Sequence, residues 1–360
     1  MKKIILFVLS SALTLMTACI NNKVYIDRLS IQDIGLPTDC TPGYAKGVSA
    51  PFCGTVEGRF ITAGGANFPD KPVIEGGVKK YYNDILCLEN SQWSKVGEMP
   101  LAAAYGGSMH HNGKLYLVGG NDGTRTMSEV YSVALTDGRF EIKEETAMPA
   151  AVEQAGYACD GQAMYVFGGL TAGGTYSKVL EGKEVNGTLV WTEMADMPES
   201  LVQPIAMAVN GRLYVWGGFD PATGSIPLKG WCMDKGDRQW REIQGAPDGQ
   251  TFVGASAAAA DGRLAVIGGV NNDVFAWGIS IASAEDRYRY MTMEPSEYRF
   301  NRKLRVFDPE TEEWSVPGEA EALALAGAGF ASDGEYLYVL GGELKPGVRT
   351  PKAWKLKINW

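Results

Sequence analysis

The sequence predicts an all-β fold, a six-bladed β-propeller in a single domain that spans residues 24–360. A short apolar run ending in Gly-Gly occurs six times in the 360 residues, at intervals of roughly 50 residues. A tight turn precedes each run, and a strand that often carries Trp follows it. Repeats of this length indicate an array in which each unit buries its apolar faces against its neighbours. The pairs are Gly64-Gly65, Gly119-Gly120, Gly168-Gly169, Gly217-Gly218, Gly268-Gly269 and Gly341-Gly342.

Each repeat has the pattern of a four-stranded blade. Asn-Gly or Asp-Gly between two apolar runs predicts a hairpin, because both turn residues adopt positive φ. These turns are Glu57-Gly58, Asn112-Gly113, Asp160-Gly161, Asn210-Gly211, Asp261-Gly262 and Asp333-Gly334. The fourth strands carry Trp93, Trp191, Trp240 and Trp314. The whole pattern is typical of the kelch-type repeat. The Gly-Gly pairs are expected to allow close backbone approach where strands crowd the central axis.

The last repeat lacks a fourth strand. Only three strands follow residue 325 before the sequence stops at Trp360. The unassigned strand near Val24 to Ile31 is expected to complete this blade and so close the ring, which removes free sheet edges.

Residues 1–18 are typical of a signal peptide, because Lys2 and Lys3 precede an apolar stretch. The segment Met16-Thr17-Ala18-Cys19 resembles the bacterial lipoprotein signal. This predicts lipid on Cys19, a tether at residues 19–23 and a location in the cell envelope, in the periplasm or at the outer membrane. The lipid would be the only membrane contact. The alternative is ordinary signal cleavage with Cys19 incidental.

Composition narrows the range of partners. The formal charge is −9, and the absence of a basic stripe argues against nucleic-acid binding. The remaining cysteines match no zinc-binding spacing, and no metal or cofactor is expected. An oxidising compartment would permit a Cys40–Cys53 bridge; free thiols are the alternative. These cysteines are Cys40, Cys53, Cys87, Cys159 and Cys232.

The loops that follow the Gly-Gly pairs are expected to form the functional face, because the turns on the opposite face have no room for a pocket. The longest of these loops runs from Val270 to about Arg302. Loops of this length inside compact domains are usually functional or disordered. It is predicted to be a partial lid, with a solvated decoration as the alternative. His110 and His111 precede a tight turn and belong to the opposite face.

Four segments resemble the bacterial sialic acid mutarotases, also called N-acetylneuraminate epimerases, a family of six-bladed kelch propellers. They are Gly64-Gly65-Ala66-Asn67-Phe68-Pro69, Gly268-Gly269-Val270-Asn271-Asn272, Phe300-Asn301-Arg302-Lys303 and Gly342-Glu343-Leu344-Lys345-Pro346-Gly347-Val348-Arg349-Thr350. The segment with Asn67 comes first here and late in well-known members, so the sequence resembles a cyclically permuted branch. A closed ring tolerates such permutation, because any connection between blades can be cut without unmaking the core.

The resemblance implies an isomerase that interconverts the anomers of N-acetylneuraminic acid or a related acidic sugar. It implies that Glu343 and Arg349 are the catalytic pair. A carboxylate can remove and return the proton of the anomeric hydroxyl, and a guanidinium can grip the sugar carboxylate with two hydrogen bonds. The alternative for this pair is a surface salt bridge on a stiff turn.

Three further residues are candidates for substrate binding. Asn67 and Asn271 follow Gly-Gly pairs and are expected to point into the same mouth, although Asn is also a common turn residue. Phe68 is expected to stack on the sugar, with rim packing as the alternative.

Other functions fit the sequence less well. A kelch copper oxidase would need His and Tyr ligands in the mouth, and a sialidase would show Ser-x-Asp-x-Gly-x-x-Trp turns, which are absent. A non-enzymatic propeller that binds a glycan or protein at the cell envelope remains the alternative, because propellers host unrelated functions. The oligomeric state is left open by the sequence.

Overall fold

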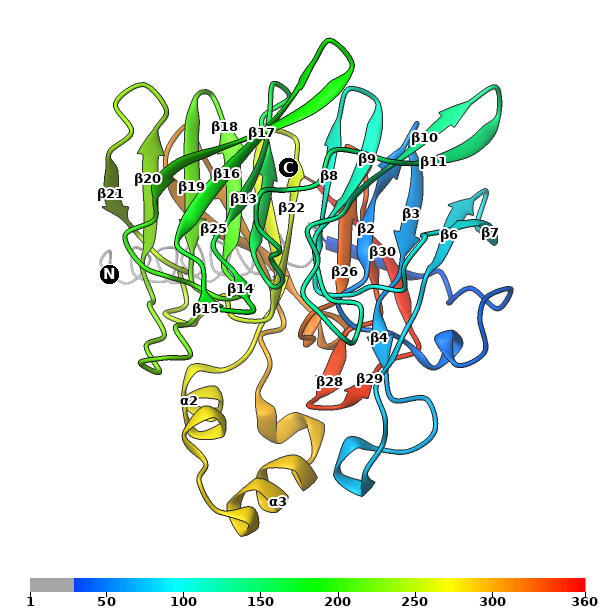
Figure 1. The fold of residues 1–360 in the computed structure, drawn as a ribbon. Coiled ribbons are helices and arrows are strands. Elements are labelled where there is room, and N and C mark those ends of the chain that lie inside the picture. Colours follow the sequence, from blue (N-terminus) through cyan, green and yellow to red (C-terminus); the bar gives the residue numbers. More distant parts are fainter. Residues whose placement is uncertain (1–28, 360) are drawn as a thin grey trace, which may run out of the picture.

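The computed structural model describes residues 29–359. The predicted signal peptide, Cys19, the tether at 19–23 and residues 24–28 lie outside the described residues. The described part forms six four-stranded antiparallel sheets arranged as the blades of a propeller (Figure 1).

The first three blades follow chain order from the inner strand outward. Blade 1 contains β2 (Phe52–Val56), β3 (Arg59–Ala63), β6 (Asp84–Glu89) and β7 (Gln92–Glu98). Blade 2 contains β8 (Gly107–His111), β9 (Lys114–Val118), β10 (Val130–Thr136) and β11 (Arg139–Glu144). Blade 3 contains β12 (Gly156–Cys159), β13 (Met164–Phe167), β16 (Lys178–Val185) and β17 (Thr188–Asp196).

Blades 4 and 5 repeat this order, and blade 6 departs from it. Blade 4 contains β18 (Ile205–Val209), β19 (Arg212–Trp216), β20 (Gly230–Asp234) and β21 (Trp240–Ile243). Blade 5 contains β22 (Ala255–Ala260), β23 (Arg263–Gly268), β24 (Lys303–Asp308) and β25 (Glu313–Glu319). Blade 6 contains β26 (Gly329–Ser332), β27 (Leu337–Leu340), β30 (Ala353–Ile358) and β1 (Leu29–Asp33).

The fourth strand of blade 6 therefore comes from the other end of the described chain. β1 pairs with β30 in antiparallel register, from Leu29 opposite Ile358 to Asp33 opposite Trp354. The strand expected near Val24 to Ile31 is thus described from Leu29 onward, and it extends two residues further than expected.

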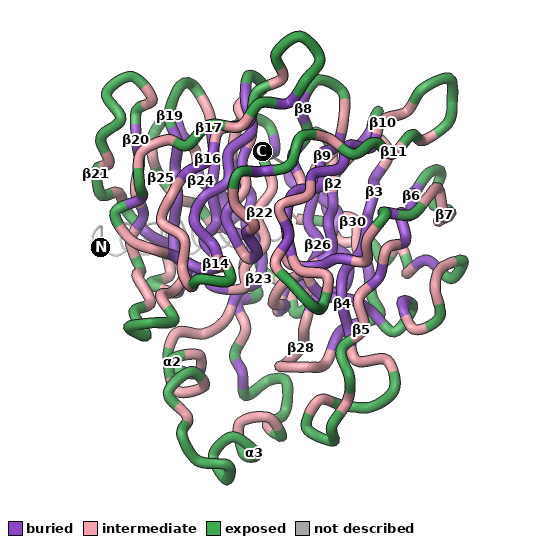
Figure 2. The backbone as a smooth tube through the Cα atoms, in the orientation of Figure 1, coloured by how far each residue is buried: buried purple, intermediate pink, exposed green. Residues whose placement is uncertain are grey.

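Apolar side chains fill the spaces between neighbouring blades. Six clusters of buried residues each draw on two adjacent blades, and one of them joins blade 6 to blade 1. In that cluster the rings of Phe60 and Tyr338 stack with centroids 4.8 Å apart. Figure 2 shows the buried strand segments in the interior and the exposed segments at the turns and loops. Because no blade covers its own faces, the ring is the unit that stabilises the fold.

The Gly-Gly pairs allow close approach, as predicted, but the approach is between adjacent blades rather than at the axis. In blade 6, Gly342 donates a backbone hydrogen bond to Val48 of the loop entering blade 1, at 2.8 Å. A Cβ on Gly341 would lie 2.2 Å from the same carbonyl oxygen. Any larger residue here would push the two blades apart.

The tight turns follow two geometries, and the sequence predicted one. At Glu57, Asn112, Asn210 and Asp261 both turn residues have positive φ, as predicted. At Asp160 and Asp333 only the glycine does. There the aspartate Oδ1 accepts hydrogen bonds from backbone N–H groups two and three residues later. A side-chain acceptor therefore replaces the left-handed first residue in these two hairpins.

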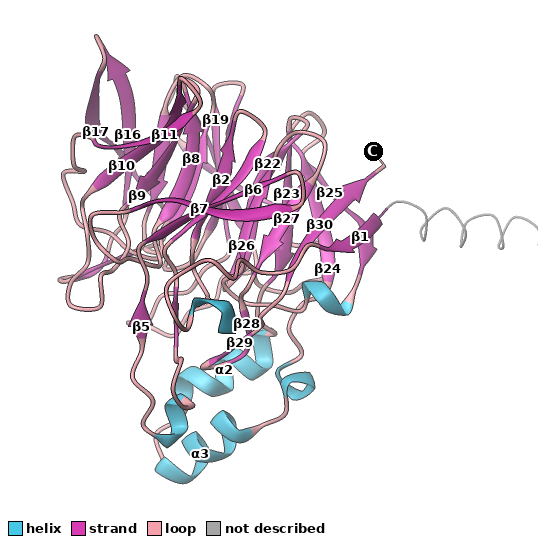
Figure 3. Cartoon of the chain, turned by 90° about the vertical axis from the view of Figure 1, so that its right-hand side faces the viewer, coloured by secondary structure: helices cyan, strands magenta, loops and turns pink. Residues whose placement is uncertain are grey.

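The long loop of blade 5 folds into helices that the sequence did not predict. They are α2 (Asn272–Ser280), α3 (Ala284–Thr292) and a short 3-10 helix, η3 (Pro295–Tyr298). Other short 3-10 helices are η1 (Tyr44–Lys46), η2 (Val73–Glu75) and η4 (Glu321–Leu323). Small hairpins stand on the same face: β4 (Ala66–Asn67) with β5 (Lys80–Tyr81), β14 (Leu170–Thr171) with β15 (Gly174–Thr175), and β28 (Glu343–Lys345) with β29 (Val348–Arg349). Figures 1 and 3 show α2 and α3 gathered below the propeller beside β28 and β29.

Cys40 and Cys53 are both free thiols, so the structure does not contain the bridge between them. Within residues 29–359, no helix is both long and apolar enough to cross a membrane.

Candidate active site

A ring of six backbone positions surrounds the central axis on the face that carries the long loops. One residue from each blade contributes, just before the inner strand, and all six have positive φ. Five backbone hydrogen bonds of 2.7–3.0 Å join neighbours around the ring. Four of the six are not glycine, and such strained positions concentrate at functional sites. The ring residues in order are Ala50, Tyr105, Gln154, Gln203, Gly254 and Gly327.

A cavity of about 380 Å³ opens at this ring. A second cavity of about 200 Å³ shares lining residues of the inner strands with the first, among them Cys53, Ser108 and Tyr157, and is also lined by His110. The insert of blade 5, residues 270–302, is called the lid below. Its residues Phe275 and Tyr290 line the cavity, so the insert covers one side of the cavity. Among residues 29–359, no group of three His, Cys, Asp or Glu side chains is placed to hold a metal ion. The size and enclosure suit one small molecule.

The hairpin of β28 and β29 brings the predicted pair together. Glu343 and Arg349 face each other in the strand register, and Arg349 Nη2 lies 2.8 Å from Glu343 Oε1. Backbone hydrogen bonds between Glu343 and Ala326 fix the hairpin above the ring. Glu343 and Pro346 line the cavity. The six-residue spacing therefore places the carboxylate at the mouth, as the sequence predicted.

Arg349 lies behind Glu343 and is not part of the cavity lining. Its side chain is 3% exposed, whereas that of Glu343 is 24% exposed. The guanidinium lies over the ring of Phe68, 5.0 Å from its centroid, and Nε donates to Ser49 Oγ at 3.1 Å. Nη1 is buried without a hydrogen-bond partner among the described residues. A buried donor without a partner is costly, so this nitrogen has unused capacity for an anion.

The charge state of Glu343 depends on two opposing effects. Burial raises the pKa of Glu343 above its ordinary value, because the carboxylate loses water contact. The positive charges of Arg349 and Lys79 and the hydrogen bond from Ser49 oppose that rise. A carboxyl with a raised pKa is a stronger base once it is ionised, which suits proton transfer near neutral pH.

The structure does not bring Asn67 or Asn271 into the cavity wall. Asn67 is 2% exposed; it donates to the carbonyls of Gly43 and Gly47 and accepts from Tyr82. Asn271 caps α2 by accepting from Val274 N–H and donates to Gln250. Both side-chain amides form hydrogen bonds within the loops, so their positions do not support the expected contacts with the sugar. Phe68 supports Arg349 instead of lining the cavity.

Several cavity residues were not singled out in the sequence. Ser49 bridges Arg349 and Glu343, and Tyr105 accepts a 2.9 Å hydrogen bond from the exposed Lys79. Gln154 and Gln203 line the wall formed by blades 3 and 4. The ring residues could have been identified from the sequence by their constant position, because each one lies just before the inner strand of its blade. Lys345 donates to the Met293 carbonyl at 2.7 Å and so ties the hairpin to the lid.

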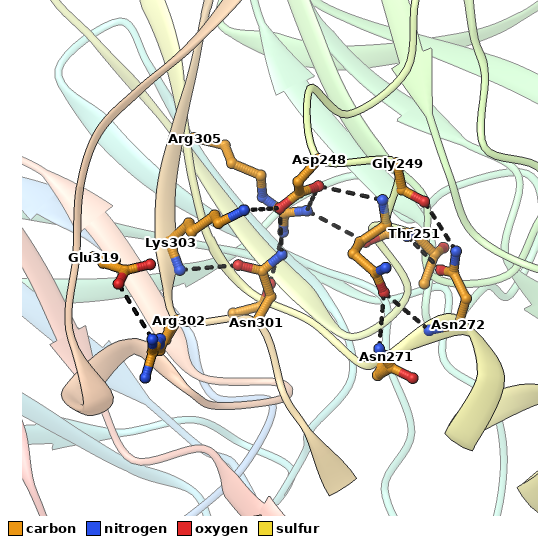
Figure 4. A network of polar contacts seen from close by, with 12 residues as sticks. Asp248, Gly249, Thr251, Asn271, Asn272, Asn301, Arg302, Lys303, Arg305 and Glu319 are labelled. Carbon is orange, nitrogen blue, oxygen red and sulfur yellow. Dashed lines mark hydrogen bonds and ion pairs between the residues drawn. The ribbon is translucent and has the colours of Figure 1, made fainter.

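The lid stands on a polar network centred on Asp248 (Figure 4). At the end of the insert, Asn301 donates to Asp248 at 2.8 Å. At its start, Asn272 donates to the Gly249 carbonyl at 3.0 Å and accepts from Thr251 N–H. One short loop therefore holds both ends of the insert and positions α2 and α3 over the cavity.

The fold and this site define a class: six-bladed propellers with a carboxylate and a guanidinium paired at the mouth of the axial cavity. Comparison with known proteins gives the family of the chain. The family model described as N-acetylneuraminate epimerase matches residues 16–142 and 145–360, so the chain belongs to that family.

Individual relatives match a shorter part of the chain. N-acetylneuraminate epimerase of Haemophilus influenzae (strain PittEE) is 30% identical over 226 residues, 59% of each chain. That of Brucella melitensis is 31% identical over 234 residues, 59% of this chain and 58% of the relative. The match therefore spans under two thirds of the length of these relatives. The solved structure of YjhT aligns with a TM-score of 0.53 and 24% identity over 59% of this chain and 65% of that chain, and it shows the same fold.

Proposed function

We propose that this protein interconverts the anomers of N-acetylneuraminic acid or a related acidic sugar. The observation that carries the proposal is the Glu343–Arg349 pair, with its 2.8 Å contact and its carboxylate at the cavity wall. Membership of the N-acetylneuraminate epimerase family supports the substrate class.

Glu343 acts as the general base in this proposal. It removes the proton of the anomeric hydroxyl, the bond between the anomeric carbon and the ring oxygen breaks, and the ring oxygen takes a proton from solvent water, to which it returns that proton when the ring closes. Rotation about the bond beside the new ketone exposes its other face, and the reverse steps close the ring as the other anomer. Glu343 returns its proton to the anomeric oxygen, so no atom or electron is gained or lost.

Arg349 supplies positive charge for the sugar carboxylate. Its Nε and Nη2 are engaged by Ser49 and Glu343, while Nη1 has no hydrogen-bond partner within residues 29–359. A carboxylate that reaches Nη1 would satisfy that donor and stand beside the base. The sugar carboxylate is attached to the anomeric carbon, so this places the reacting hydroxyl near Glu343.

Replacement of the base tests the proposal. Glu343→Gln keeps shape and an acceptor for Arg349 but cannot take a proton, so catalysed anomer exchange should fall by about 10²–10⁴-fold. Proton NMR of freshly released sugar measures the exchange. Glu335→Gln is the matched control, because Glu335 lies in a hairpin of the same blade with its side chain 62% exposed.

The alternative is a binding module without catalysis. It predicts that the wild-type protein leaves the rate of anomer exchange unchanged at any concentration. Exchange as fast in Glu343→Gln as in the wild type would remove Glu343 as the base.

Two further proposals concern the chain as a whole. We infer from Met16-Thr17-Ala18-Cys19 that Cys19 carries lipid and that the protein resides in the cell envelope. Mass spectrometry of the mature N-terminus tests this, and an unmodified Cys19 would contradict it. We also propose that the blade order is cyclically permuted relative to other family members. Superposition on a relative with the chain order rotated should then align more than the 59% matched in simple order.

A further inference from the structure

Two glutamines face the catalytic pair across the cavity. Gln154 and Gln203 occupy the ring positions of blades 3 and 4 and line the cavity. Glu343 and Ser49 belong to the elements at blades 6 and 1. In a six-membered ring, blades 3 and 4 lie opposite blades 6 and 1. A ligand held at Glu343 therefore extends towards the glutamines.

The glutamine amides form a chain with a fixed direction. It starts at Glu153, which is 8% exposed and accepts from Asn121, Thr126 and Gln154 at 2.9–3.3 Å. An ionised carboxylate can only accept hydrogen bonds, so the Gln154 amide must direct its nitrogen towards Glu153. Gln154 Oε1 then accepts from Gln203 Nε2 at 2.7 Å. Gln203 Oε1 is left as the free end of the chain, an acceptor on the cavity side.

An apolar surface lies directly beside this acceptor. A Cβ placed on Gly254 would lie 3.6 Å from Val270 Cγ1 and 3.8 Å from Gln203 Oε1, so these two atoms flank the same point. Phe275 of the lid lines the same cavity, and its ring packs edge-on against Phe219 of blade 4 at 5.1 Å. Ala326 Cβ lies 3.3 Å from the same point, so apolar atoms surround it closely. The wall thus offers a hydrogen-bond acceptor next to an apolar surface.

We propose that this wall is a subsite for an acetamido group, with Gln203 Oε1 accepting its N–H and Val270 and Phe275 packing on its methyl. An acetamido group presents one donor beside one methyl, which matches the pattern of the wall. A hydroxyl in its place could use the acceptor but would leave the apolar surface unfilled. The inference rests on the proposed function for the position of the carboxylate, and it makes Gln203 a specificity-determining residue.

The test compares two sugar acids on the same protein preparations. One is N-acetylneuraminic acid, and the other is its analogue with a hydroxyl in place of the acetamido group. Dissociation constants come from calorimetry, and anomer exchange comes from NMR. Gln203→Met keeps an unbranched side chain at this positive-φ position but removes the acceptor. It should reduce the preference for the acetamido sugar by roughly three- to tenfold, in binding and in the specificity of exchange.

The matched control is Gln162→Met, at an exposed turn position on the opposite face. It should leave the preference unchanged. Because the preference is a ratio within one preparation, a partly folded variant does not distort it.

The outcomes separate this inference from the proposed function. Equal loss of affinity for both sugars in Gln203→Met, or a wild-type protein without preference, overturns the acetamido subsite while anomer exchange stands. A preference that depends on Gln203 without any catalysed exchange supports the subsite and overturns the isomerase. If neither sugar acid binds the wild-type protein, both are overturned.

Discussion

Two arginine–carboxylate pairs stand on the loop face of this propeller, and they differ in whether the carboxylate reaches the cavity. Arg305 is fully buried; it donates to the carbonyls of Gly268 and Thr251 and lies 3.8 Å from Asp248. Asp248 also accepts from Asn301 and from the backbone N–H of Gln250 (Figure 4). Each arginine has one buried nitrogen without a hydrogen-bond partner among residues 29–359, Nε of Arg305 and Nη1 of Arg349. The carboxylate paired with Arg349 lines the cavity, and Asp248 does not.

The comparison shows that the presence of an acid–arginine pair at the end of a blade does not by itself indicate a catalytic or a structural role. Burial lowers the pKa of Arg305 to about 10, with the Asp248 charge opposing the shift, and the pair supports the lid. At the other pair, burial raises the pKa of Glu343 while Arg349 opposes it. What distinguishes the second pair is the access of its carboxylate to the cavity, because each arginine has one unsatisfied nitrogen among the described residues.

The largest expected difference between the pairs is in stability. Asp248→Ala leaves the Arg305 charge buried without its partner and removes the contact with Asn301 at the end of the lid insert. This should lower the free energy of unfolding by about 3 kcal/mol. Glu343→Ala should cost about 1 kcal/mol, because Arg349 keeps Ser49 and Phe68 and the space opens to the cavity. Urea denaturation measures both, and equal losses would show that the two pairs have the same structural role.

The fold was predictable because its determinants are local and repeated. Gly-Gly after an apolar run, a tight turn and Trp in the outer strand each report on one blade, and six copies establish the ring. The missing strand of blade 6 indicated the pairing of β1 with β30. Two hairpins differed because the sequence does not show whether an aspartate adopts positive φ or accepts hydrogen bonds from the turn, as Asp160 and Asp333 do. The helices of the insert were missed because strand repeats carry no information about an insertion.

The site was predictable only where its residues share one short segment. Glu343 and Arg349 meet across a single hairpin, so their spacing was enough. Gln154 and Gln203 are brought together by the ring, and neither stands in a recognisable motif. Asn67 and Asn271 were misjudged because a residue after Gly-Gly lies on the correct face, but the direction of its side chain depends on the loop it stabilises. The structure also places Arg349 behind Glu343. The number of residues between the two in the sequence does not show which of them is more deeply buried.

Two Arg349 variants separate its two roles, charge and grip. The base works ionised, so activity is lost as pH falls through the pKa of Glu343, which burial raises above the ordinary carboxyl range. Arg349→Met removes the opposing charge, so the acid limb of the pH–rate profile should move to higher pH. Arg349→Lys keeps the charge, so the limb should stay near its wild-type position, while loss of the unpartnered Nη1 donor and of the contacts that fix the guanidinium should raise KM by roughly tenfold or more. A limb that does not move in Arg349→Met would mean that the guanidinium does not control the ionisation of Glu343.

The smallest expected effect concerns the contact between the catalytic hairpin and the lid. Lys345 donates to the Met293 carbonyl just after α3, at 2.7 Å, and strand β28 carries both Lys345 and Glu343. A partly exposed hydrogen bond of this kind typically contributes a net free energy of about 1 kcal/mol. Lys345→Met keeps the length of the side chain and loses the bond, so the lid should open more often and release substrate sooner.

This loosening should raise KM by roughly fivefold and change kcat by less than about twofold, because Glu343 and Arg349 keep their own contacts. Lys352→Met is the control, since Lys352 pairs with Asp33 at the surface with its side chain 54% exposed. Steady-state anomer exchange at several sugar concentrations gives both constants. An unchanged KM in Lys345→Met, or the same rise in Lys352→Met, would show that the hairpin and the lid are not coupled. The Asp248 network would then be sufficient to hold the lid over the cavity.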